Sequence, residues 1–144
     1  MKQLVFDTGA LIAVQRDLTR YRSLIRLARE HGVPLRTSAA VLTEFLGGSP
    51  RRSRAAASFV ASRLVAGNVT GDRARRAALL QQGALDAGRS TDPDAIDALV
   101  AAEAEQHGGL LVIDGDRPAF EALAEASHDG ITLADLDDLI PRSA

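Results

Sequence analysis

Residues 2–13 read KQLVFDTGALIA, and this stretch decides how the rest of the chain can fold. The apolar run at residues 4–6 stops abruptly at Asp7, and a second apolar segment follows Gly9. A short apolar run that ends at a polar residue is typical of a strand buried in a parallel α/β sheet. Because open α/β sheets bind ligands at the carboxyl ends of their strands, we expect Asp7 to lie at a ligand site.

Strand and helix signals alternate along the rest of the chain. The predicted strands are residues 4–6, 33–37, 68–70, 110–113 and 131–133. The predicted helices are residues 9–31, 38–46, 51–66, 73–87, 92–107, 118–126 and 134–140. This alternation predicts an α/β fold in which helices cover both faces of a parallel sheet. In the helix at 73–87, we expect Ala78, Leu79 and Leu85 to be buried.

Length and composition predict one cytoplasmic domain spanning residues 1–144. A chain of 144 residues can bury a full hydrophobic core, and its composition, 46% hydrophobic and 25% charged, is typical of a globular protein. No apolar run is long enough to span a membrane, and Asp7 interrupts the N-terminal apolar run before it could act as a signal peptide. The absence of cysteine excludes disulfides and thiolate metal sites.

The small net charge of −2 hides a strong asymmetry along the chain. Residues 1–85 hold 14 Lys and Arg against 5 Asp and Glu, whereas residues 86–144 hold 3 against 14. Arginines gathered around an acidic spot would suit a metal ion and a polyanion, but the two halves could equally pair across the surface. Arg51, Arg52 and Arg54 could bind RNA phosphate, although solvation of a helix start is the favoured interpretation.

Four carboxylates are poorly explained by local structure: Asp7, Glu44, Asp97 and Asp116. Asp7 could also be a turn residue that hydrogen-bonds its own backbone. Glu44 has no basic residue three or four positions away, although it could be a solvated helix residue. Asp116 shares its predicted place after the fourth strand with Asp114, and either residue could instead cap the next helix.

Asp97 gives the strongest signal of the four. In a helix that starts at Asp92-Pro93, it lies in the second turn, past the capping positions. Its neighbours three and four residues away include the acid Asp94 and no base, so we expect a cation or a basic partner outside the helix. Asp94 itself is adequately explained by the helix dipole.

These acids predict a divalent metal site if the first and fourth strands are neighbours. Several carboxylates cannot all stay ionised in a confined site unless a cation binds. Carboxylate oxygens without histidine or cysteine favour Mg²⁺ or Mn²⁺ over zinc, and such sites serve phosphoryl chemistry.

Four segments together resemble the PIN domain family, and most closely the VapC toxins of bacterial VapBC toxin–antitoxin pairs. They read LVFDTGALIA, AAVLTEFLGG, DPDAIDALVAAEA and LLVIDGDRPAF, in the order of the family. The resemblance implies a three-layer α/β/α domain with a central five-stranded parallel sheet. It also implies an Mg²⁺- or Mn²⁺-dependent endoribonuclease that forms a homodimer and is inhibited by a cognate VapB-like antitoxin.

The resemblance also assigns roles to individual residues. Asp7, Glu44, Asp97 and Asp116 match the acidic quartet of the family, and Thr8 matches its small hydroxyl residue beside the first acid. VapC proteins often have Thr or Ser where this chain has Asp114, so either Asp114 or Asp116 is the fourth ligand. Asp94 has an acidic counterpart in some relatives. We therefore expect cleavage of single-stranded RNA by metal-activated water.

Three other interpretations compete with this one. Asp-Thr-Gly-Ala after an apolar strand also occurs in aspartic proteases, but their all-β fold conflicts with the many predicted helices. A phosphoacceptor receiver domain needs a lysine near its acidic pocket, and the only lysine here is Lys2. A non-catalytic PIN-like module that binds RNA or protein is the more serious rival, although the presence of all four acids disfavours it.

Overall fold

A five-stranded sheet forms the centre of the structure, a computed structural model that describes residues 3–88 and 92–143. Its strands are β1 (Leu4–Phe6), β2 (Leu35–Ser38), β3 (Val65–Gly67), β4 (Leu110–Ile113) and β5 (Thr132–Asp135). The strand order is β3-β2-β1-β4-β5, and every neighbouring pair is parallel. The expected five-stranded parallel sheet is therefore confirmed.

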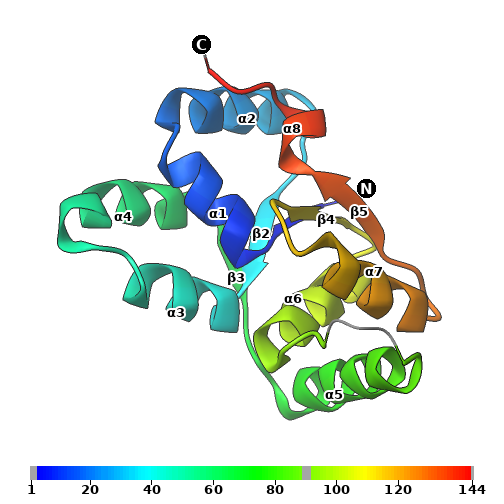
Figure 1. The fold of residues 1–144 in the computed structure, drawn as a ribbon. Coiled ribbons are helices and arrows are strands. Elements are labelled where there is room, and N and C mark those ends of the chain that lie inside the picture. Colours follow the sequence, from blue (N-terminus) through cyan, green and yellow to red (C-terminus); the bar gives the residue numbers. More distant parts are fainter. Residues whose placement is uncertain (1–2, 89–91, 144) are drawn as a thin grey trace.

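Helices cover both faces of this sheet and complete three layers. They are α1 (Thr8–Gln15), α2 (Leu18–Glu30), α3 (Ala39–Gly47), the short 3₁₀ helix η1 (Arg51–Ser53), α4 (Arg54–Ser62), α5 (Gly71–Asp86), α6 (Ala95–Gln106), α7 (Arg117–Ala126) and α8 (Leu136–Leu139). Figure 1 shows α1, α2 and α8 above the strands and α5, α6 and α7 below them. No helix within the described ranges is long and apolar enough to cross a bilayer.

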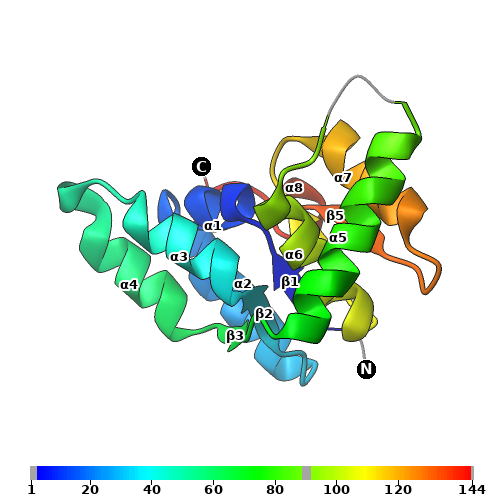
Figure 2. The same cartoon turned by 90° about the horizontal axis from the view of Figure 1, so that it is seen from below.

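The strand order reverses beside β1, and this reversal creates the ligand-binding edge of the fold. The chain moves outward from β1 through β2 to β3, and then crosses back to β4 on the other side of β1. Right-handed crossovers place the helices of these two excursions on opposite faces. In both views α3 and α4 lie to one side and α5, α6 and α7 to the other (Figures 1 and 2). The ends of β1 and β4 therefore meet at the switch point.

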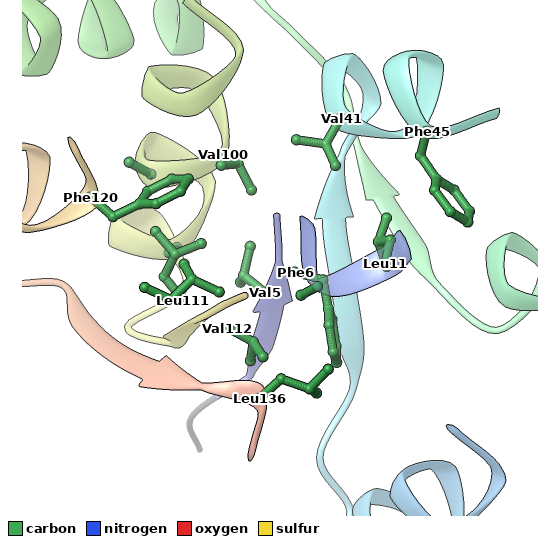
Figure 3. Packing of buried hydrophobic residues seen from close by; sticks show 14 of the residues in the cluster. Val5, Phe6, Leu11, Val41, Phe45, Val100, Leu111, Val112, Phe120 and Leu136 are labelled. Atoms are coloured by element: carbon green, nitrogen blue, oxygen red, sulfur yellow. The ribbon is translucent and has the colours of Figure 1, made fainter. Parts of the chain in front are cut away.

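The central strands are apolar on both faces because both faces are covered. In the parallel register Val5 is opposite Leu111 and Phe6 is opposite Val112, and all four side chains are fully buried. Figure 3 shows Leu111 beside Phe120 of α7. These contacts anchor β1, so the position of Asp7 after Phe6 is fixed by the core.

The predicted helix at 9–31 is wrong as a single element, because it breaks into α1 and α2 at residues 16–17. Asp17 caps α2 by accepting a hydrogen bond from the backbone N–H of Arg20 at 3.1 Å. An aspartate in mid-pattern can start a new helix in this way, and the apolar periodicity conceals the break.

The third strand was predicted at 68–70, but β3 spans Val65–Gly67 and pairs with β2. Thr70 instead caps α5 by accepting a hydrogen bond from the backbone N–H of Arg73. The predicted helix 51–66 ends at Ser62, so the chain has room for a strand before residue 68.

The expected burial on α5 is also wrong, because the helix turns a different face inward. Leu79 and Leu85 are 57% and 46% exposed. The buried positions are Ala77, Leu80 and Ala84, and α5 packs against α6 and α7. Small alanines let these helices approach closely, which a ranking by hydrophobicity alone does not detect.

Gly9 is predicted to be intolerant of a side chain, because a Cβ there would lie 2.7 Å from the backbone oxygen of Asp114. Overpacking against backbone commonly costs about 1–3 kcal/mol, so we expect Gly9→Ala to lower the free energy of unfolding by about this amount. Urea unfolding followed by circular dichroism would measure it.

Gly47 in α3 provides the matched control, because a Cβ there would meet nothing within 4 Å. Gly47→Ala should raise the free energy of unfolding by about 0.4–1 kcal/mol through the unfolded state. Equal effects of the two substitutions would contradict the close contact between α1 and the end of β4.

Candidate metal centre

Asp7 lies at the carboxyl end of β1 and caps α1. It is only 6% exposed, and its Oδ1 accepts a hydrogen bond from the backbone N–H of Ala10 at 2.8 Å. The turn interpretation of Asp7 is therefore correct as far as it goes, because the carboxylate does bond its own backbone. One oxygen serves the cap, and Oδ2 has no hydrogen bond within the described chain.

The pKa of the Asp7 carboxyl is raised to about 7. Burial is the largest cause, and the negative charges of Asp97, Asp114 and Asp116 raise it further. The N–H of Ala10 lowers the pKa but does not offset these effects. The three other acids therefore lie close enough to Asp7 for their charges to act on it.

Asp97 occupies a different position in its helix from the one predicted. The helix α6 begins at Ala95 rather than at Pro93, with Asp94 as its N-cap. Asp97 is the third residue of α6 and forms a capping box: the N–H of Asp97 donates to Asp94 Oδ1 at 2.8 Å, and that of Asp94 donates to Asp97 Oδ2 at 3.2 Å. The expectation that Asp97 lies past the capping positions is therefore wrong.

Capping does not remove the electrostatic strain on Asp97. The pKa of this carboxyl is raised to about 6; burial is the largest cause, and the charges of Asp94, Asp116 and Glu44 also contribute. The half-buried Asp97 thus feels Asp116 from the end of β4 and Glu44 from α3. The four acids of the predicted quartet, which are far apart in sequence, interact at one edge of the sheet.

Asp114 and Asp116 both follow β4, but their settings differ. Asp116 adopts a left-handed backbone conformation with φ 50°, the only non-glycine residue to do so in the described ranges. It stands at the N-cap of α7 yet makes no side-chain cap, so capping does not explain it. The charge of Asp116 raises the pKa values of both Asp7 and Asp97, whereas the charge of Asp114 raises those of Asp7 and Arg142. Strained residues cluster at functional sites, which favours Asp116 as the fourth acid.

The donor set fits a hard divalent cation. Asp7, Glu44, Asp97, Asp114 and Asp116 make no ion pair with a basic residue of the described chain. Carboxylate oxygens are the ligands that Mg²⁺ and Mn²⁺ prefer. Within the described residues, no three acidic or histidine side chains already meet at metal-holding distance.

Two cavities adjoin these acids. The first, of about 310 Å³, is lined by Asp114, by residues 12, 13, 16, 17 and 20 of α1, α2 and their junction, and by residues 142–143 of the C-terminal segment. The second, of about 490 Å³, lies between α1, α3 and η1 and is lined by Thr8, Glu44 and Arg52 among others. Arg16 lines both cavities. Nothing in the sequence distinguishes Arg16 from the other arginines except the helix break that follows it.

Comparisons with known proteins agree with this architecture. The family model of the PIN domain matches residues 4–126. The VapBC2 complex of Rickettsia felis bound to a promoter DNA fragment has a TM-score of 0.73 at 16% identity, covering 92% of this chain and 97% of that chain. DNA-bound VapBC of Salmonella typhimurium has a TM-score of 0.73 at 21% identity, covering 94% and 99%.

A third solved structure is VapC20 of Mycobacterium tuberculosis, described as a toxin that cleaves the sarcin–ricin loop. It has a TM-score of 0.57 at 22% identity and covers 83% of this chain and 94% of that chain. No curated protein sequence matches this chain significantly. At identities this low, the solved structures show only a shared fold. The family model, in contrast, matches residues 4–126, which is most of the chain. The chain therefore belongs to the PIN domain family.

Proposed function

We propose that this chain is a metal-dependent endoribonuclease and the VapC-type toxin of a toxin–antitoxin pair, acting in the cytoplasm as a single domain over residues 1–144. The observation that supports this most strongly is the raised pKa of buried Asp7, to which the charges of Asp97, Asp114 and Asp116 contribute. Acids that destabilise one another at the switch point of an α/β sheet favour a bound cation there.

In this proposal Asp7, Glu44, Asp97 and Asp116 would hold Mg²⁺ or Mn²⁺, with Thr8, Asp94 and Asp114 in supporting positions. A bound ion would supply positive charge for the phosphodiester and make a water molecule more acidic. The acids would hold the ion from the ends of β1 and β4 and from α3 and α6. The capping hydrogen bonds to Asp7 and Asp97 occupy one oxygen of each carboxylate, and the other oxygen has no hydrogen bond within the described residues.

The proposed partners are RNA as substrate, a cognate VapB-like antitoxin and a second copy of the chain in a homodimer. Support for the antitoxin comes from the solved structures of similar fold, since those from Rickettsia felis and Salmonella typhimurium are VapBC complexes. Support for RNA comes from VapC20, whose described target is an RNA loop. The homodimer is proposed from the family resemblance.

Asp7→Asn and Asp97→Asn should each lower Mg²⁺-dependent RNA cleavage by about 100-fold or more, because each removes a charged ligand of the ion. Asparagine keeps an oxygen that can accept the capping hydrogen bond, so both variants should remain folded. The measurement is cleavage of a labelled RNA pool by identically purified proteins, with circular dichroism to check folding.

Asp72→Asn is the matched control, because Asp72 is an exposed acid on α5 paired with Arg75 and distant from the cluster. It changes the net charge equally and should leave cleavage unchanged. If both cluster variants cut RNA as fast as the Asp72 variant, the metal-dependent assignment is wrong.

Metal-free protein should lose stability as pH rises, because the pKa of Asp7 is raised in the folded state. Its contribution is fully present below the unfolded pKa of 3.8 and is lost as pH rises through about 7. The free energy of unfolding in EDTA should therefore be lower at pH 8 than at pH 5. Asp7→Asn should gain on the order of a few kcal/mol over the parent at pH 8.

Adding Mg²⁺ or Mn²⁺ should reverse this loss at pH 8 in the parent protein. Saturation at about 100 times the Kd adds about 2.7 kcal/mol. Asp7→Asn should respond much less to either metal, whereas Asp72→Asn should respond like the parent. Melting curves that ignore both metals would favour the non-catalytic PIN-like module.

A further inference from the structure

Arg16 is an exposed arginine without a partner among the described residues, placed between two cavities that are each lined by an acid of the cluster. It caps the C-terminus of α1, and its guanidinium makes no ion pair or hydrogen bond with any residue that the structure describes. One cavity that it lines contains Asp114, and the other contains Thr8 and Glu44. The positive charge of Arg16 can therefore contact a ligand bound in either cavity.

Apart from Asp114, the other charged groups that line the first cavity are hydrogen-bonded to partners. Asp17 accepts hydrogen bonds from the backbone N–H and the hydroxyl of Ser143, at 3.0 and 2.7 Å. Arg20 is buried and donates to Asp137 at 2.6 Å and to the carbonyl oxygen of Ile140. Arg142 donates to both carboxylate oxygens of Asp137 at 3.1 Å. Of the guanidinium groups that line this cavity, Arg16 is therefore the one without a hydrogen-bonded partner among the described residues.

The distance along α1 separates Arg16 from the metal-binding acids. Asp7 caps the N-terminus of α1 and Arg16 its C-terminus, and a helix of eight residues is about 12 Å long. One phosphate cannot contact both ends of such a helix. A nucleic-acid strand carries a negative charge on every nucleotide, so one phosphate can lie at the acids while a neighbouring phosphate of the same strand contacts Arg16.

We propose that Arg16 binds a backbone phosphate of single-stranded RNA next to the scissile one. The strand passes from the cavity beside Glu44, over the acidic cluster, into the cavity beside Asp114. Arg52 in the second cavity adds positive charge along this path. The fork of N–H donors on arginine suits phosphate oxygens. This inference rests on the proposed ribonuclease function.

Arg26 offers a matched control for Arg16. It is likewise an exposed arginine without a partner in the described chain, and it lies on the outer face of α2. The cavities that it lines contain none of the acids of the cluster. Replacing either residue with glutamine removes the same charge, so a general electrostatic effect would appear in both variants.

The test measures binding of a fluorescein-labelled, unstructured single-stranded RNA in Mg²⁺, with Asp7→Asn in every protein to prevent cleavage. Adding Arg16→Gln should weaken binding by about tenfold, since a hydrogen bond between charged groups is lost. It should also reduce the slope of log K against log salt by about 0.7, the value of one phosphate contact on a single strand. Arg26→Gln should change the affinity by no more than about twofold and should leave the salt slope unchanged.

Arg16→Lys should restore the salt slope, because it keeps the charge, while recovering only part of the affinity. In the active protein, Arg16→Gln should raise KM more than it lowers kcat, with an unchanged melting temperature. Equal binding and equal salt slopes for the Arg16→Gln and Arg26→Gln variants, or no measurable binding at all, would overturn the inference. If RNA binding depends on Arg16 but the parent protein does not cleave RNA, the proposed chemistry fails and the assigned RNA path stands.

Discussion

The acidic edge of this protein depends on the burial of one carboxylate, that of Asp7 at the end of the central strand. Burial disfavours the charged form, and the N–H of Ala10 recovers part of that cost while it starts α1. The same side chain therefore ends β1, begins a helix and supplies the innermost acid of the cluster. Since β1 pairs with β4 on one side and β2 on the other, moving Asp7 would disturb the centre of the sheet.

The sheet was largely predictable because its central strands are buried on both faces and read as plain apolar runs. The strand at 110–113 was predicted with the bounds that it has, and Ser38 caps α3 as expected. The break at Asp17 and the strand at Val65–Gly67 were not found. A cap inside a continuous periodic pattern has no signature in periodicity, and a three-residue edge strand has too few residues to show one.

The acids of the site were partly predictable for an imperfect reason. Asp97 was singled out as an acid without a local partner, whereas it forms a capping box with Asp94. Its raised pKa comes from burial and from acids on other elements, including Asp116 and Glu44. Such an environment arises only when distant segments meet, so the raised pKa of Asp97 could not be predicted from the sequence of its own helix. The sequence order of four segments, which the family resemblance used, carried information that local spacing did not.

The structure supports the explanation of the charge asymmetry by pairing across the molecule. Arginines of the first half pair with acids of the second: Arg20 with Asp137, Arg36 and Arg73 with Glu103, and Arg76 with Glu105.

Glu103 is 1% exposed, and a side chain at Gly67 would collide with its carboxylate, so the carboxylate would have to shift away from its arginine partners. Removing one partner from such a buried group would be costly, because an unpaired charge would remain inside the protein. The pairs of Arg36, Arg73 and Arg76 connect α5 and α6 to β2 and to each other. Folding thus pairs Glu103 and Glu105 with arginines, whereas the acids of the cluster, at the ends of β1 and β4 and on the adjacent helices, make no ion pair with a basic residue of the described chain.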